Sequence, residues 1–82
     1  MKRILYFKAE WCLPCKNYKP VIAQVNQKVP VEEIDVDRQP HLADMYAVRN
    51  IPTVLIVKDN VAVARFTGVQ APITILDAFN KA

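Results

Sequence analysis

The chain has 82 residues, 52% hydrophobic and 23% charged, with a formal net charge of +3. This length predicts a single domain, residues 1–82, that needs most of its apolar side chains in one core. The longest uncharged apolar run, Ile51 to Val57, is too short to cross a bilayer, so no membrane partner is expected. Basic residues are spread along the chain without interleaved aromatic ones, which argues against nucleic acid.

The N-terminal segment begins with basic and then apolar residues, as a secretion signal does. Lys8 and Glu10 end that apolar stretch early, and no small-residue cleavage site follows. We therefore expect Ile4–Ala9 to belong to the mature fold. The chain has two cysteines, Cys12 and Cys15, whose spacing indicates redox or metal chemistry more than a secreted disulfide scaffold. A cytoplasmic location is expected.

The first predicted elements are a strand and a helix. Arg3–Lys8 is rich in β-branched and aromatic residues and has no polar face, which is typical of a central strand. From Pro14 to about Val29, apolar residues recur at helical steps and share one face. These residues are Tyr18, Ile22, Val25 and Val29. Pro20 lies inside this helix and should bend it, separating a short segment with the cysteines from a longer one.

The middle of the chain predicts a second strand and a short helix. Val31–Val36 reads as a strand reached through a helical crossover, so it should lie parallel to the first strand. Pro40 suits the first position of a helix that ends before Asn50. The inward stripe expected on this helix is Leu42, Met45 and Tyr46.

The C-terminal part predicts a hairpin and a last helix. Thr53–Val57 and Val61–Phe66 are strand-like and are separated by the polar turn Lys58-Asp59-Asn60, so they should pair antiparallel. A helix from about Pro72 to Lys81 should direct Ile73, Leu76 and Phe79 to the sheet. The order βαβαββα predicts an α/β sandwich with a four-stranded mixed sheet and three helices on its two faces.

The two cysteines form a Cys-x-x-Cys pair where the first strand gives way to the first helix. This spacing lets both sulfurs approach bonding distance on one helical turn. Cys12 is at the helix start, where free N–H groups and the macrodipole favour a thiolate, so it is the expected attacking sulfur. Cys15, one turn into the helix and expected to be the more shielded of the two, would then attack the mixed disulfide formed with the substrate. Lys16 adds positive charge nearby.

Four features of the chain resemble the thioredoxin family in identity, order and approximate spacing. They are Trp11-Cys12-Leu13-Pro14-Cys15-Lys16, Pro20 in the following helix, Ile51-Pro52-Thr53, and Gly68. The resemblance covers nearly the whole chain and implies a minimal thioredoxin fold, similar to the glutaredoxin-sized thioredoxins that lack an additional N-terminal strand and helix. It also implies a monomeric thiol–disulfide oxidoreductase that reduces protein disulfides, needs no cofactor and is itself reduced by thioredoxin reductase.

The resemblance also implies a substrate-binding surface. In the family the bond before the proline matching Pro52 is cis, and the backbone of the preceding residue, here Ile51, pairs with an extended substrate segment. Trp11, Pro52 and Gly68 would frame an apolar surface around Cys12, and Pro14 is expected to contact the substrate as well. Without the resemblance, a trans bond would be expected, because only about 5–6% of X–Pro bonds are cis in folded proteins.

The residues between the cysteines bear on the reduction potential. Pro14 stiffens the turn and removes one backbone donor, while Leu13 replaces the glycine usual in thioredoxins. Potentials in this class run from about −270 mV for thioredoxin to about −120 mV for the most oxidising members. We expect a reducing or moderately reducing value.

The chain departs from the family pattern at two positions. Tyr6 stands where thioredoxins usually have a buried aspartate that assists deprotonation of the second cysteine, and Glu33 stands where a lysine usually accompanies it. Proton removal from Cys15 is therefore expected to rely on water, on Glu10, or on the Tyr6 hydroxyl as a hydrogen-bonding partner.

Three other interpretations stay open at this point. Zinc needs four ligands, but the chain offers two cysteines and a distant His41, so no metal is expected. A glutathione-linked glutaredoxin would usually carry threonine-valine-proline and paired glycines, where this chain has Asn50-Ile51-Pro52 and Gly68 alone. A non-catalytic binding subunit would use the Trp11 and Pro52 surface without turnover.

Overall fold

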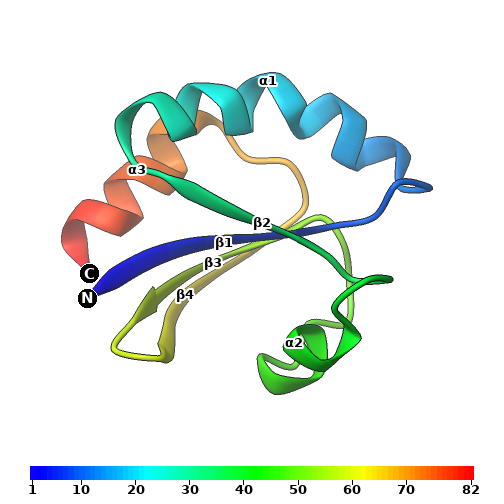
Figure 1. The fold of residues 1–82 in the computed structure, drawn as a ribbon. Coiled ribbons are helices and arrows are strands. Elements are labelled where there is room, and N and C mark those ends of the chain that lie inside the picture. The colour runs from blue at the N-terminus through cyan, green and yellow to red at the C-terminus, as the bar shows by residue number, and fades with distance from the viewer.

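The computed structural model describes residues 1–82 as a four-stranded sheet covered by three helices (Figure 1). In chain order the elements are β1 (Lys2–Lys8), α1 (Leu13–Lys28), β2 (Val31–Asp35), α2 (Pro40–Met45), β3 (Thr53–Lys58), β4 (Val61–Thr67) and α3 (Pro72–Lys81). The strands lie in the order β2-β1-β3-β4. β1 and β2 are parallel, and the other pairs are antiparallel. The predicted order βαβαββα and the mixed sheet are confirmed.

β1 lies inside the sheet between β2 and β3, and its residues Ile4–Phe7 are buried. Alternation along the strand sends Ile4 and Tyr6 to the face covered by α1 and α3, and Leu5 and Phe7 to the face covered by α2. The helices therefore divide between the two faces, as Figure 1 shows. A strand buried on both sides explains why its sequence has no polar face.

Two apolar clusters, one on each face, stabilise the sheet. The cluster under α1 and α3 contains Ile4, Tyr6, Tyr18, Ile22, Val25, Val54, Ile56 and Ile75. The cluster under α2 contains Leu5, Phe7, Ile34, Val48, Leu55 and Val57. Burying each large side chain contributes about 1.5–3 kcal/mol, so these clusters hold the helices against the two faces of the sheet.

α1 is one continuous helix of 16 residues that runs through Pro20. The helix is thus not interrupted at Pro20, and the bend expected there stays a prediction. Pro20 and Lys16 are both exposed, so the Lys16 carbonyl that loses its intrahelical donor can be hydrated. The apolar face is confirmed, because Tyr18, Ile22 and Val25 are buried.

Two of the predicted inward residues on the shorter helices are wrong. On α2, Met45 is 68% exposed, whereas Leu42 and Tyr46 pack against the core. On α3, Ile73 is 71% exposed, and Ile75 is the fully buried residue. Each short helix has one narrow face that contacts the sheet. The sequence pattern locates that face only to within about one residue.

The β3–β4 hairpin is tighter than predicted. β3 extends through Lys58, which leaves a two-residue turn of Asp59 and Asn60, with φ of 52° and 68°. Positive φ at both positions matches the turn whose twist suits adjacent antiparallel strands, and Asp and Asn tolerate it. An irregularity opposite Ile56 and Val57 shifts the register of β4.

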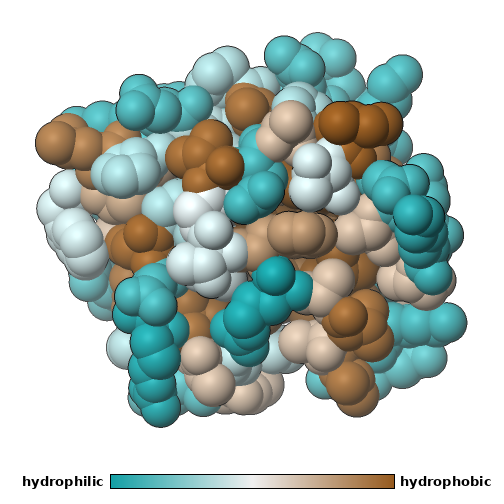
Figure 2. Space-filling model, turned by 180° about the vertical axis from the view of Figure 1, so that it is seen from behind, coloured by the Kyte–Doolittle hydropathy of each residue, from teal (hydrophilic) through white to brown (hydrophobic).

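The surface is mixed in character. Figure 2, which views the molecule from behind, shows brown apolar groups separated by hydrophilic side chains on that face. None of the helices has the length and apolar content required to span a membrane.

Candidate active site at the start of α1

Cys12 and Cys15 form a disulfide, with their Cα atoms 5.3 Å apart. The predicted proximity of the two sulfurs is confirmed. The expectation that Cys15 is the more shielded cysteine is wrong in this oxidised form, because Cys12 is 4% exposed and Cys15 6% exposed. Local burial therefore does not distinguish the two sulfurs.

Position relative to the helix does distinguish them. Cys12 is the N-cap of α1, and its Sγ accepts a hydrogen bond from the backbone N–H of Cys15, with an N–S distance of 3.2 Å. The first turn of α1 contains no acidic residue that would oppose a negative charge there. The free N–H groups and the dipole of a helix N-terminus both stabilise an anion, so this end of α1 favours Cys12 as a thiolate.

The disulfide rests on an apolar base. Ala9 is buried with the two cysteines, and the half-buried Val36 and Ile51 pack against them. Pro14, in the first turn of α1, is exposed and points no N–H at the site. The pair is thus held in place by packing against these apolar side chains.

The loop before β3 lies beside this pair. The Ile51–Pro52 peptide bond is cis, which confirms the expectation drawn from the resemblance. Pro52 is buried, and its carbonyl accepts a hydrogen bond from the Gly68 N–H at 2.9 Å. Gly68 has a φ of +87°, and nothing lies within 4 Å of where its Cβ would be. The backbone at Gly68 is therefore open to an approaching chain.

Trp11 is 67% exposed and does not pack in the core. Its indole Nε1–H donates to Asp37 Oδ2 at 2.8 Å. β1 and β2 are parallel, so the residues that follow their carboxyl ends meet at one edge of the sheet. The sequence analysis missed Asp37, which that parallel pairing would have indicated. It also missed the exposed apolar side chains of Leu13, which follows Cys12, and Val69, which follows Gly68.

Tyr6 lies beneath the first turn of α1 and is 2% exposed. Its hydroxyl donates to the backbone carbonyl of Cys15 at 3.2 Å, so it contacts the peptide and not the sulfur. Its ring packs edge-on against Tyr18, with centroids 5.4 Å apart. Burial, followed by the nearby Glu33 and Tyr18, raises the pKa of Tyr6 to about 12. The hydroxyl therefore stays protonated near neutral pH and cannot take a proton from a thiol.

Glu10 and Lys16, the other suggested modulators, both lie at the surface. The Glu10 carboxylate is 81% exposed and is 3.7 Å from the Arg38 guanidinium. Both side chains line a cavity of about 380 Å³ beside Cys15. Lys8 and Glu33 line the same cavity and form an ion pair of 3.1 Å. With Lys19, which also lines the cavity, the structure thus places five charged side chains near Cys15.

Comparison with known proteins identifies this arrangement. The family model described as "Thioredoxin" matches residues 1–81. The thioredoxin of Rickettsia felis is 34% identical over 79 residues, covering 92% of this chain and 75% of that protein. The thioredoxin of Chlamydia trachomatis is 32% identical over 81 residues, covering 95% and 79%.

Solved structures agree. A point mutant of a thioredoxin from Halobacterium salinarum superposes with a TM-score of 0.87 at 30% identity, covering 98% of this chain and 73% of that one. The oxidised form of mitochondrial thioredoxin 3 from Saccharomyces cerevisiae gives a TM-score of 0.85 at 27% identity, covering 99% and 78%. With a Cys12–Cys15 disulfide at the head of α1 and a matching fold, the chain belongs to the thioredoxin family of oxidoreductases that reduce protein disulfides.

Proposed function

We propose that Cys12 is the attacking sulfur and Cys15 the resolving sulfur of the disulfide-reducing cycle. The observation that carries this assignment is the N-cap position of Cys12, whose Sγ receives the Cys15 N–H. In the reduced protein the Cys12 thiolate attacks a substrate disulfide, and one substrate sulfur leaves as a thiolate. Cys15 then attacks Cys12, which releases the second substrate thiolate and closes the Cys12–Cys15 bond.

The substrate-binding surface follows from the open backbone around the cysteines. We assign it to Trp11, Pro14, Ile51, Pro52 and Gly68, the residues expected from the sequence. The exposed Trp11 ring and the empty space over Gly68 support this assignment, since an extended peptide needs an apolar platform and free backbone. Pro52 contributes by holding the backbone of Ile51 in place, because its own side chain is buried and its carbonyl is bonded to the Gly68 N–H.

The electron donor we propose is a thioredoxin reductase, and the protein works as a monomer. We propose a cytoplasmic location, which agrees with the use of both cysteines in the redox pair and none in a structural disulfide.

Two assays test these assignments. Cys12→Ser should abolish the reduction of insulin disulfides, whereas Cys15→Ser should trap a mixed disulfide between Cys12 and the substrate. If Cys15→Ser instead blocks the first attack, the order of the two sulfurs is reversed. Reduction of the oxidised protein by NADPH and thioredoxin reductase, compared with reduction by glutathione, tests the donor. Faster reduction by glutathione would overturn that proposal.

A further inference from the structure

Resolution of the mixed disulfide requires Cys15 to lose a proton, because the thiolate and not the thiol attacks a disulfide. The cycle therefore needs a group near Cys15 that accepts this proton. The Tyr6 hydroxyl donates to the Cys15 carbonyl and is held protonated. Glu10 extends into solvent toward Arg38. Neither of these groups meets the requirement.

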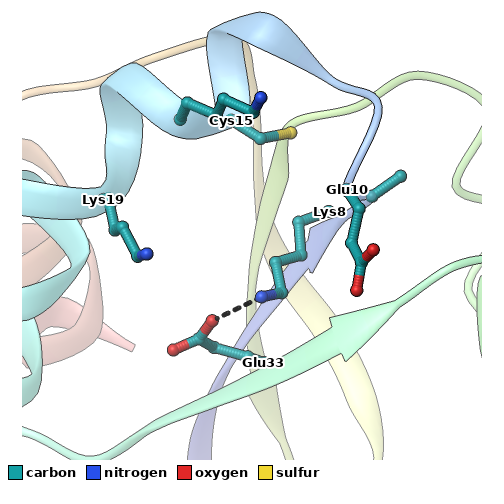
Figure 3. Close-up of a pocket in the computed structure, with 7 residues that line it drawn as sticks. Lys8, Glu10, Cys15, Lys19 and Glu33 are labelled. Carbon is teal, nitrogen blue, oxygen red and sulfur yellow. Dashed lines mark ion pairs between the residues drawn. The ribbon is translucent and has the colours of Figure 1, made fainter.

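The cavity beside Cys15 contains one other carboxylate, that of Glu33. Figure 3 shows Cys15 and Lys19 on α1, with Glu33 and Lys8 paired across the space from them. The charged and titratable groups that face Cys15 are Lys16 and Lys19 from α1, Tyr6 and Lys8 from β1, Glu10 from the following loop, and Glu33 from β2. A second cavity beside it shares Lys8, Glu10 and Glu33 and adds Asp35 and Arg38.

The register of the sheet explains why Glu33 lies on the same side of the sheet as α1, which carries Cys15. Glu33 is the parallel partner of Tyr6, and partners in adjacent strands share a face. Tyr6 belongs to the cluster beneath α1, so Glu33 lies on that side of the sheet. Lys8, two residues after Tyr6, is on the same face and reaches Glu33 with an Nζ–Oε1 distance of 3.1 Å. The contribution of Glu33 to the raised pKa of Tyr6 also places its charge near the base of the site.

We propose that Glu33, oriented by Lys8, accepts the Cys15 proton through water in this cavity. The cavity is open, five of its seven lining residues are charged, and Glu33 is half exposed, so water can connect the thiol to the carboxylate. The proton passes from the Cys15 thiol to Glu33, and the Cys15 thiolate attacks Cys12. The bond between Cys12 and the substrate sulfur breaks, and its electron pair leaves with the substrate thiolate. This inference rests on the proposed order of the two sulfurs.

The sheet provides a matched control. Glu32 is the next residue on β2, but it lies on the opposite face, where it pairs with Arg3 at 2.7 and 2.8 Å. Glu32→Gln therefore removes a paired carboxylate from the same strand without changing the cavity. Glu10→Gln removes the other cavity carboxylate.

The test follows the two steps separately, using a disulfide of thionitrobenzoate as the substrate. The reduced protein releases one coloured thionitrobenzoate when Cys12 attacks and a second when Cys15 resolves the mixed disulfide. Glu33→Gln should slow the second release about tenfold or more near neutral pH, the lower end of what a positioned base contributes. The first release should be unchanged. The deficit should shrink as pH rises, because hydroxide then removes the proton. Glu33→Asp should recover part of the rate.

Several outcomes would overturn the proposal. One is a second release that is equally fast in Glu33→Gln and the parent, or equally slowed in Glu32→Gln or Glu10→Gln. Another is a deficit that stays constant with pH, which would indicate a structural effect. Lys8→Gln leaves the carboxylate in place and should slow the second release less than Glu33→Gln does. A larger loss in Lys8→Gln would show that the ammonium acts instead. Failure of the parent protein to give two releases would refute the proposed cycle itself.

Discussion

Cys12 Sγ accepts the backbone N–H of Cys15, so the residue that caps α1 is also the cysteine assigned to attack the substrate. Capping and reactivity therefore depend on the same atom. A sulfur is a weak acceptor compared with the oxygen of Ser or Asp, which are the usual caps. The arrangement favours the thiolate form of the sulfur. An anion is a stronger acceptor for the capping N–H and interacts favourably with the positive end of the helix dipole.

This relationship predicts the reactivity of Cys12 with an alkylating agent. In the reduced protein, iodoacetamide should modify Cys12 faster than Cys15, with a pH midpoint below that of an ordinary cysteine. The two rates can be followed by mass spectrometry of tryptic peptides over a pH series. Equal rates with an ordinary midpoint would contradict the role of the helix N-terminus.

The Trp11–Asp37 hydrogen bond predicts a binding defect. Asp37→Ala frees the indole of Trp11, so the apolar platform loses its fixed orientation. The loss of one hydrogen bond of about 0.5–1.5 kcal/mol should raise the KM for insulin by about two- to tenfold, with kcat nearly unchanged. Asp44→Ala is the control, because Asp44 is an exposed partner of Arg49 away from the site. An equal rise in KM in both variants would show that the orientation of Trp11 is not the cause.

Substitutions at Gly68 can distinguish the effect of backbone strain from the effect of steric obstruction. Gly68→Ala should destabilise the protein by about 1–2 kcal/mol, because φ is +87° there, whereas Gly68→Asn should cost less, since Asn tolerates positive φ better. Both variants place a side chain in the open space and should lower kcat/KM for insulin. Urea unfolding measures the first effect. Activity that follows stability alone would show that Gly68 has no part in docking.

Tyr6 predicts how stability depends on alkaline pH. The folded pKa of about 12 exceeds the ordinary value of 10.0, so the folded state keeps a proton that the unfolded state releases. This stabilisation is complete below pH 10 and is lost as pH rises through about 12. Tyr6→Phe should unfold with a shallower pH dependence in that range and should lose about 1 kcal/mol at neutral pH with the hydrogen bond to Cys15. The free energy of unfolding is measured by denaturant titration at several pH values. The same dependence on pH in Tyr6→Phe and the parent would refute this prediction.

Ala47 offers a stabilising change away from the site. It follows α2 with a φ of 54°, a conformation that costs an alanine about 1–2 kcal/mol and glycine little. Ala47→Gly should raise the free energy of unfolding by about 0.5–1 kcal/mol after the entropy of glycine is counted. Ala64→Gly in β4 should lower it by a similar amount. The two variants are compared by urea unfolding, and a loss in Ala47→Gly would refute the strain.

Much of this protein could be predicted from local patterns in the sequence. Helical steps between Tyr18, Ile22 and Val25 fixed the buried face of α1, and the all-apolar Ile4–Phe7 indicated a central strand. The Cys12–Cys15 spacing sufficed to predict a disulfide, because two residues three positions apart on a helical turn lie close enough for their sulfurs to bond. These are short-range properties of the backbone, which hold before any distant contact forms.

Only the tertiary structure decided which residues lie around the cysteines. The rotation of α2 and α3, wrongly assigned through Met45 and Ile73, depends on which side of a short helix packs on the sheet. Asp37 reaches Trp11, and Glu33 and Lys8 reach the cavity at Cys15, because β2 lies parallel to β1 in one particular register. A shift of one residue in that register would put Glu32 in place of Glu33. The strand register that prevents this shift cannot be predicted from any local pattern in the sequence.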